Sequence, residues 1–216
     1  AAIRAEDPRA AVCVVSDHGF APVTKVLWLD AIFVKEGLIT LKTKDTSVEK
    51  SGITAWVARP WHAGGSAAIV LNDPSDAAAR AKVKALLERL VADPANGIAA
   101  ILDEAAIREA GGMPAASFWV TMRAGYSVSA TLQPSIVSIV SARGAHGHSP
   151  ALPEVAATFI IAGEGIAAGR DLGSIDMRSI APTLARVMGV PFPSAEVPAH
   201  EILESRAGFS PPSRKP

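Results

Sequence analysis

Two short loops carry the residues of this chain that are best suited to bind a metal cation. The first, Ser16-Asp17-His18-Gly19, directly follows an apolar run over residues 10–15. Where a strand turns, an adjacent carboxylate and imidazole can both face one cation, and their oxygen and nitrogen atoms suit Zn²⁺, Mn²⁺ or iron. The same Asp-His dipeptide would also occur if the aspartate only capped a helix. This motif alone therefore does not decide between a metal site and a helix cap.

The second loop is Gly-Ala-His-Gly-His-Ser-Pro over residues 144–150, which contains His146 and His148. Glycines around a histidine permit positive φ angles and let the main chain approach a ligand closely. A flexible loop with exposed histidines is the alternative for this segment taken by itself. The three other histidines of the chain are His62, His200 and the His18 of the first loop.

Each loop adjoins a segment that predicts a buried strand. Residues 10–15 form a continuous apolar run with three valines, which predicts a strand buried on both faces of a parallel sheet. Polar residues at the carboxyl end of such a strand lie where open α/β sheets place their ligands. Residues 156–162 predict a second buried strand, and residues 27–36 and 177–188 predict helices.

Between the two loops, residues 51–135 have the pattern of a small inserted α+β subdomain. Strands are predicted at residues 53–58, 66–71 and 97–102. Ser75 or Asp76 is expected to cap a helix. The apolar face of that helix is formed by Ala79, Val83, Leu86, Leu87, Leu90 and Val91. Residues 118–132 predict a hairpin.

Composition excludes several classes of partner and site. The 216 residues include 21 Lys and Arg against 21 Asp and Glu, so the net charge gives no electrostatic case for binding nucleic acid or an anionic membrane. The longest apolar runs are far short of the ~18 residues that a membrane-spanning helix needs. The single cysteine, Cys13, excludes an internal disulfide and a cysteine-rich zinc site.

Three segments together resemble the type I phosphodiesterase / nucleotide pyrophosphatase branch of the alkaline phosphatase superfamily. Residues 12–20 (Val-Cys-Val-Val-Ser-Asp-His-Gly-Phe) are similar to its strand followed by Ser-Asp-His-Gly. Residues 144–166 are similar to its Gly-x-His-Gly segment, and residues 179–190 to the helix that closes the fold. The three segments occur in family order, and their combination is far more specific than Ser-Asp-His-Gly alone.

The resemblance implies an α/β fold: an alkaline-phosphatase-like core with a mostly parallel sheet flanked by helices, whose N-terminal part is absent from this chain. Residues 1–50 and 136–209 would form the C-terminal part of that core. Residues 51–135 would be its inserted subdomain, and residues 210–216 a flexible tail.

The resemblance also implies a site for two divalent cations, zinc or alternatively manganese. Carried over residue by residue, Asp17 and His18 would bind the ion that also contacts the nucleophile, and His146 would bind the other. Two such ions clamp the attacking and leaving oxygens of an in-line displacement at phosphorus. The substrate would be a phosphate ester of nucleotide type, and no nucleic-acid partner is expected.

One departure from the family pattern matters. In the family a Thr or Ser nucleophile, an Asp ligand and an Asp-x-x-x-His pair precede Ser-Asp-His-Gly, and none of them occurs in the sixteen residues before Asp17. We therefore expect the catalytic nucleophile upstream of this chain. We also expect the chain alone to be inactive and to bind the ions weakly or not at all, since catalytic zinc sites usually have three protein ligands.

Several alternatives stay open at this point. The chain could be a catalytically inactive α/β module, or could belong to a phosphonate hydrolase, a sulfatase or a phosphomutase of the same superfamily. His148 could support a metal ligand without binding the metal itself, could contact substrate, or could be an exposed loop residue. His62, beside Gly64-Gly65, could contact substrate or adjoin a simple turn. Family resemblance favours a periplasmic or extracellular location, although this chain shows no signal region.

Overall fold

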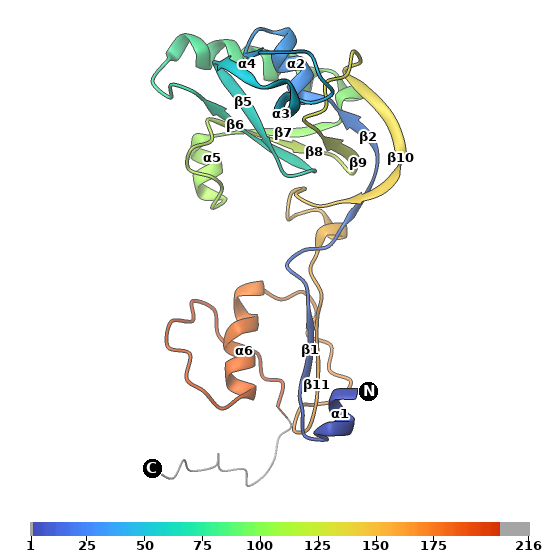
Figure 1. Cartoon of the computed structure of the whole chain (residues 1–216). Coiled ribbons are helices and arrows are strands. Elements are labelled where there is room, and N and C mark those ends of the chain that lie inside the picture. The colour runs from blue at the N-terminus through green and yellow to red at the C-terminus, as the bar shows by residue number, and fades with distance from the viewer. Residues whose placement is uncertain (1, 204–216) are drawn as a thin grey trace. The chain divides into compact units, whose positions relative to one another are not determined.

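The structure is a computed structural model that describes residues 2–203. The predicted tail at 210–216 therefore lies outside the described residues. The chain divides into two compact units, shown in Figure 1. We call His18–Ala156 the large unit, and Ala1–Asp17 with Ala157–Pro216 the small unit.

The large unit contains a four-stranded antiparallel sheet with the strand order β5-β6-β8-β7. Its strands are β5 (Ala58–His62), β6 (Ser66–Leu71), β8 (Phe118–Met122) and β7 (Ile98–Asp103). Helix α4 (Ala77–Ala92) packs along β7. The helix begins where Asp76 accepts a hydrogen bond from the Ala79 amide, and five of its six predicted apolar residues are buried, which confirms the predicted cap and apolar face.

A second, three-stranded sheet has the order β10-β2-β9. Strand β10 (Val137–Ala145) pairs antiparallel with β2 (Ala21–Leu27), and the two curve side by side in Figure 1. Strand β9 (Gly125–Val128) pairs parallel with β2. Residues 118–132 therefore do not form the predicted hairpin, because β8 and β9 belong to different sheets.

The remaining elements of the large unit are short. Strands β3 (Ile39–Leu41) and β4 (Ile53–Trp56) form an antiparallel pair. The other helices are α2 (Leu29–Lys35), α3 (Val48–Ser51), α5 (Glu104–Glu109), and the 3-10 turns η1 (Pro94–Asn96) and η2 (Pro153–Val155). One hydrophobic core joins α2 and α4 to both larger sheets, with Phe33 and Leu87 among its fully buried side chains.

The small unit holds the strand that precedes the first candidate loop. Strand β1 (Val12–Val15) pairs antiparallel with β11 (Phe159–Ala162), and Val14 and Val15 are 57% and 51% exposed. The expectation of a strand buried on both faces is therefore wrong for the described residues, because a two-stranded ribbon covers its own faces only in part. Nor do residues 2–203 form the expected mostly parallel sheet, since β2–β9, in the large unit, is the one parallel pairing among their strands.

The two compact units divide the chain at residues 17/18 and 156/157, and the domain boundaries expected at 50/51 and 135/136 stay a prediction. Strands β2 and β10, expected in the core, pair with β9 and belong to the large unit. The proposal that residues 51–135 are an insert into a larger core stays a prediction. Among the described residues no helix is long and apolar enough to cross a membrane.

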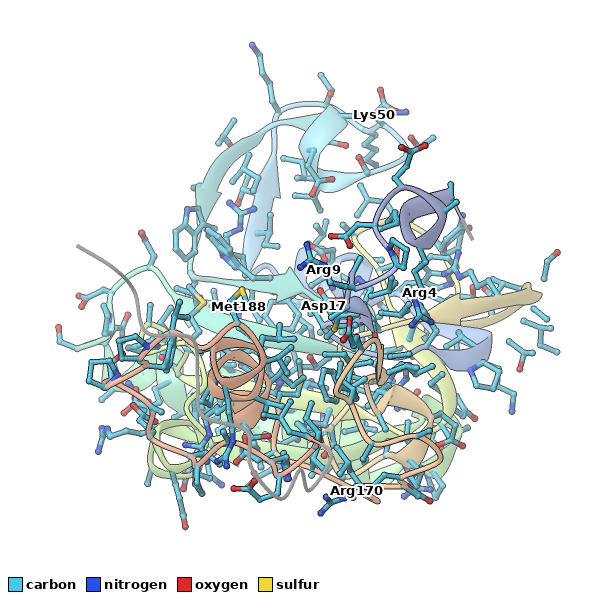
Figure 2. The ribbon with its side chains drawn as sticks, turned by 90° about the horizontal axis from the view of Figure 1, so that it is seen from below. Arg4, Arg9, Asp17, Lys50, Arg170 and Met188 are labelled. Carbon is cyan, nitrogen blue, oxygen red and sulfur yellow. The ribbon has the colours of Figure 1, made fainter. Side chains whose placement is uncertain are left out.

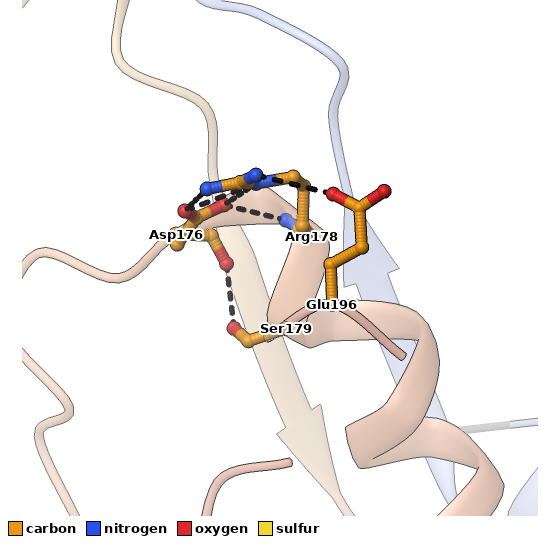
Figure 3. A network of polar contacts seen from close by, with 4 residues as sticks. All are labelled: Asp176, Arg178, Ser179 and Glu196. Carbon is orange, nitrogen blue, oxygen red and sulfur yellow. Dashed lines mark hydrogen bonds and ion pairs between the residues drawn. The ribbon is translucent and has the colours of Figure 1, made fainter. Parts of the chain in front are cut away.

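The predicted C-terminal helix is present in the small unit. A 3-10 turn, η3 (Met177–Ser179), leads into α6 (Ile180–Val187). The side chain of Asp176 caps this turn by accepting a hydrogen bond from the Arg178 amide. The Arg178 guanidinium returns to the same carboxylate at 2.7 Å and reaches Glu196 at 3.3 Å (Figure 3).

This cap predicts a defined acid sensitivity. Hydrogen bonds from the Arg178 side chain and amide lower the pKa of Asp176 from 3.8 to about 2. Because the folded-state pKa is depressed, the ionised carboxylate contributes stability that is fully present above pH 3.8 and is lost as the pH falls through about 2. A carboxyl ¹³C titration should show this low midpoint. The variant Arg178→Ala should return the midpoint toward 3.8, and an unshifted midpoint in the unmodified chain would contradict the cap.

Candidate functional site

The strand register of the large unit brings the two candidate loops together. Ala145, the last residue of β10, lies opposite Ala21, the first residue of β2. His146 follows directly after this pair on one strand, and His18 precedes it by three residues on the other. Their imidazole rings stack, with centroids 4.6 Å apart and planes inclined by 13°.

Phe20 packs against both imidazoles, with its ring nearly perpendicular to theirs. Its ring centroid lies 5.3 Å from that of His18 and 6.2 Å from that of His146, each in an edge-to-face arrangement. A Cβ atom added to Gly144 would lie 3.3 Å from the Phe20 Cβ, so the glycine leaves room for this ring. Phe20 is nevertheless 60% exposed, which leaves the cluster open on one side.

Gly19 lets the first loop pack closely against residues 154–156. Its amide donates a hydrogen bond to the Val155 carbonyl at 2.9 Å. A Cβ atom at this position would lie only 2.6 Å from the Glu154 carbonyl oxygen. A side chain would therefore push the loop away from residues 154–156, and with it His18.

A hydrogen bond fixes the tautomer of His18. Its Nδ1 lies 3.0 Å from the Gly19 carbonyl oxygen, and because a carbonyl only accepts, Nδ1 must donate. In the neutral ring the lone pair is then on Nε2. Histidines that bind metals commonly donate their other ring N–H to a backbone carbonyl in this way.

The stacking geometry decides how two such rings can bind cations. A metal bound to imidazole lies in the ring plane at about 2.0–2.1 Å from the nitrogen. Two nearly parallel planes, with centroids 4.6 Å apart, cannot both direct a lone pair at one ion. They can each bind an ion of their own, as the histidines of a two-metal site do. The chemistry of the donors therefore fits a pair of cations better than a shared one.

Asp17 is the last residue of the small unit and is labelled in Figure 2. The large unit thus contains two of the three predicted metal ligands, His18 and His146, while the third is the chain neighbour of His18. Within residues 2–203 no group of three or more His, Cys, Asp or Glu side chains is placed to hold a metal ion.

The two other histidines that the sequence singled out, His148 and His62, form hydrogen bonds within the large unit. His148 is only 6% exposed, and its Nε2 donates to the Tyr126 carbonyl at 2.8 Å, so the expectation of an exposed loop residue is wrong. His62 is bonded through Nε2 to the Asp30 carboxylate. Asp30 is 3% exposed and was not singled out; the available signal was a lone carboxylate in the first turn of a largely apolar helix.

Comparisons with known proteins give a family match. The family model described as type I phosphodiesterase / nucleotide pyrophosphatase matches residues 2–149. No curated protein matches the chain.

Among solved structures, human ectonucleotide pyrophosphatase / phosphodiesterase 5 has a TM-score of 0.54 at 15% identity, and its murine counterpart has 0.54 at 16%. An inactive variant of the murine protein in complex with AMP matches equally well. Each match covers 88% of this chain and 42% of the solved chain, so the chain spans less than half the length of these proteins. At such identities the likeness shows the fold alone.

Proposed function

Because the chain belongs to the type I phosphodiesterase / nucleotide pyrophosphatase family, we propose that it supplies the C-terminal share of the active site of a metal-dependent phosphodiesterase. The observation that carries the proposal is the stacked pair of His18 and His146, whose geometry suits two cations rather than one. The residues that complete the site, including the nucleophile, would lie outside this chain.

In this proposal each residue of the site has a distinct task. His18, whose Nδ1 donates to the Gly19 carbonyl, would bind one cation through Nε2, and Asp17 would add a carboxylate oxygen to the same cation. His146 would bind the second cation. When bound, such an ion pair neutralises the charge that develops on the transferring phosphoryl group and lowers the pKa of the attacking oxygen. Phe20 would support the pair by packing against both imidazoles.

We propose a phosphodiester of nucleotide type as the substrate. The murine structural neighbour was solved with AMP, which supports a ligand with a phosphate and a base. Two divalent cations would supply the positive charge that a phosphate needs, so the balanced charge of the chain is compatible with an anionic substrate. A periplasmic or extracellular location remains a prediction from the resemblance.

The function is tested with the full-length protein that contains this chain, supplied with Zn²⁺ or Mn²⁺. Model phosphodiester, phosphomonoester and sulfate-ester substrates should be compared, and the diester should be hydrolysed fastest. A chelator should abolish turnover. The 216-residue chain alone, as the control, should show no turnover and should bind Zn²⁺ weakly. Faster sulfate hydrolysis would indicate a sulfatase, and chelator-insensitive turnover or no turnover of any ester would refute the proposal.

A further inference from the structure

The hairpin turn Ala63-Gly64-Gly65, which joins β5 to β6, lies directly against residues 146–148. The Gly65 amide donates a hydrogen bond to the His146 carbonyl at 2.7 Å. A Cβ atom on Gly64 would lie 2.7 Å from that same carbonyl oxygen, and one on Gly65 would overlap the His148 ring. In the other direction, a Cβ atom on Gly147 would overlap the Ala63 carbonyl. The two segments therefore fit only because glycines face each other.

The turn is itself fixed in place by the neighbouring strands. The Gly65 carbonyl accepts a hydrogen bond from the Met122 amide of β8 at 2.9 Å, and the Gly64 carbonyl accepts one from the Val128 amide of β9 at 2.8 Å. Just before the turn, His62 is bonded to the buried Asp30 of α2. The turn is thus tied to both larger sheets and to a helix, which makes it a rigid support.

His148 anchors the other end of the loop. Its ring is buried against Gly65, and its Nε2 donates to the Tyr126 carbonyl of β9. On the N-terminal side of His146, the pairing of β10 with β2 holds Ala145 opposite Ala21. His146 therefore lies between two anchored neighbours, with its own carbonyl held by Gly65. Little freedom is left in the main chain that sets the direction of its side chain.

We propose that Gly64, Gly65 and His148 are positioning residues, which hold the main chain of residues 146–148 so that the His146 ring stacks on His18. The inference rests on the proposed function in one respect, because the orientation of the His146 ring matters only if His146 binds a cation. The positioning itself is a property of the metal-free chain, and it can be tested without any cation.

The first test is the variant Gly65→Ala. The φ angle of Gly65 is outside the left-handed region, so alanine meets no backbone strain there and acts only through the overlap with His148. Gly112→Ala is the matched control: its φ is also not positive, and its Cβ would meet the Ile107 side chain at 2.8 Å, away from the loop. In the metal-free chain, NOE cross-peaks between the His18 and His146 ring protons should be lost in Gly65→Ala and kept in Gly112→Ala.

A second pair of variants decides the matter if Gly65→Ala does not fold. In His148→Gln the side-chain amide nitrogen takes the place of Nε2 and can still donate to the Tyr126 carbonyl, whereas in His148→Asn it takes the place of Nδ1 and cannot. The ring cross-peaks should survive in the glutamine variant and disappear in the asparagine variant. Equal behaviour of the two would refute the role of His148.

A Zn²⁺ titration of the full-length protein separates this inference from the proposed function. Gly65→Ala should raise the dissociation constant about 10–100-fold, as loss of an outer-shell support typically does, and Gly112→Ala should leave it unchanged. If the unmodified protein bound no Zn²⁺, the proposed function would fail while the ring cross-peaks still tested the positioning. Retained cross-peaks in a folded Gly65→Ala variant, or their loss in Gly112→Ala, would overturn the inference.

Discussion

Replacing His146 by alanine in the full-length protein is expected to lower phosphodiester hydrolysis by at least about a hundredfold. The loss should exceed the ~10–100-fold that removal of an outer-shell partner costs, because His146 would be the ligand that this chain provides for one cation. Asp17→Ala should have an effect of the same order on the other cation. The measurement is kcat/KM for a model diester at saturating Zn²⁺.

The effects of substituting Asp17 and His18 on activity should not add up, which makes the prediction more specific. Asp17 and His18 are proposed to bind the same cation, so the double variant Asp17→Ala/His18→Ala should be little worse than either single variant. His200→Ala is the control for loss of a histidine, since His200 lies in the small unit, where its amide donates to the Thr183 hydroxyl. Near-full activity in Asp17→Ala or His146→Ala would refute the role of that residue as a ligand.

Truncating Phe33 is expected to destabilise the large unit by about 3–5 kcal/mol, as the Phe→Ala change does in a closely packed core. Phe33 is fully buried on α2, in the core that joins this helix to α4 and to the sheets. Removing the ring leaves a cavity that rigid neighbours on several elements cannot close.

Urea unfolding followed by tryptophan fluorescence measures this effect, because all four tryptophans lie within residues 18–156. Ile139→Ala is the matched control, since Ile139 is 83% exposed on β10 and its truncation should change the free energy of unfolding by less than about 0.5 kcal/mol. Similar losses for both variants would show that the large unit is not packed as described.

Helices, and strands such as β6 and β7, were the parts of this structure that local sequence patterns could predict. The spacing of apolar residues places the buried face of α4, and Asp76 marks its first turn, because both signals lie within a few residues of the helix. The neighbours of the strands could not be predicted in this way. Strand β9 follows β8 closely in sequence yet pairs with β2, about a hundred residues away, and no local pattern specifies such a partner.

The site likewise depends on both local and distant information. The two loops singled out Asp17, His18 and His146, and the family resemblance assigned their roles, whereas the stacking of His18 on His146 depends on the register of Ala21 opposite Ala145. His148 was expected to be exposed because its neighbours are glycine and serine. Its burial depends on Gly65, in a distant hairpin, having no side chain. The polar composition of residues 144–150 therefore did not predict the burial of His148, because the Ala63-Gly64-Gly65 turn packs on this loop.

The number of Zn²⁺ ions bound per chain in the full-length protein tests the two-cation assignment most directly. Metal-depleted protein should be titrated with Zn²⁺ and the stoichiometry compared among the unmodified protein, His18→Ala and His146→Ala. We predict two tightly bound ions in the unmodified protein and one in each variant. A single ion in the unmodified protein that both variants lose would mean that the two imidazoles share it, and the assignment of His18 and His146 to separate cations would be wrong.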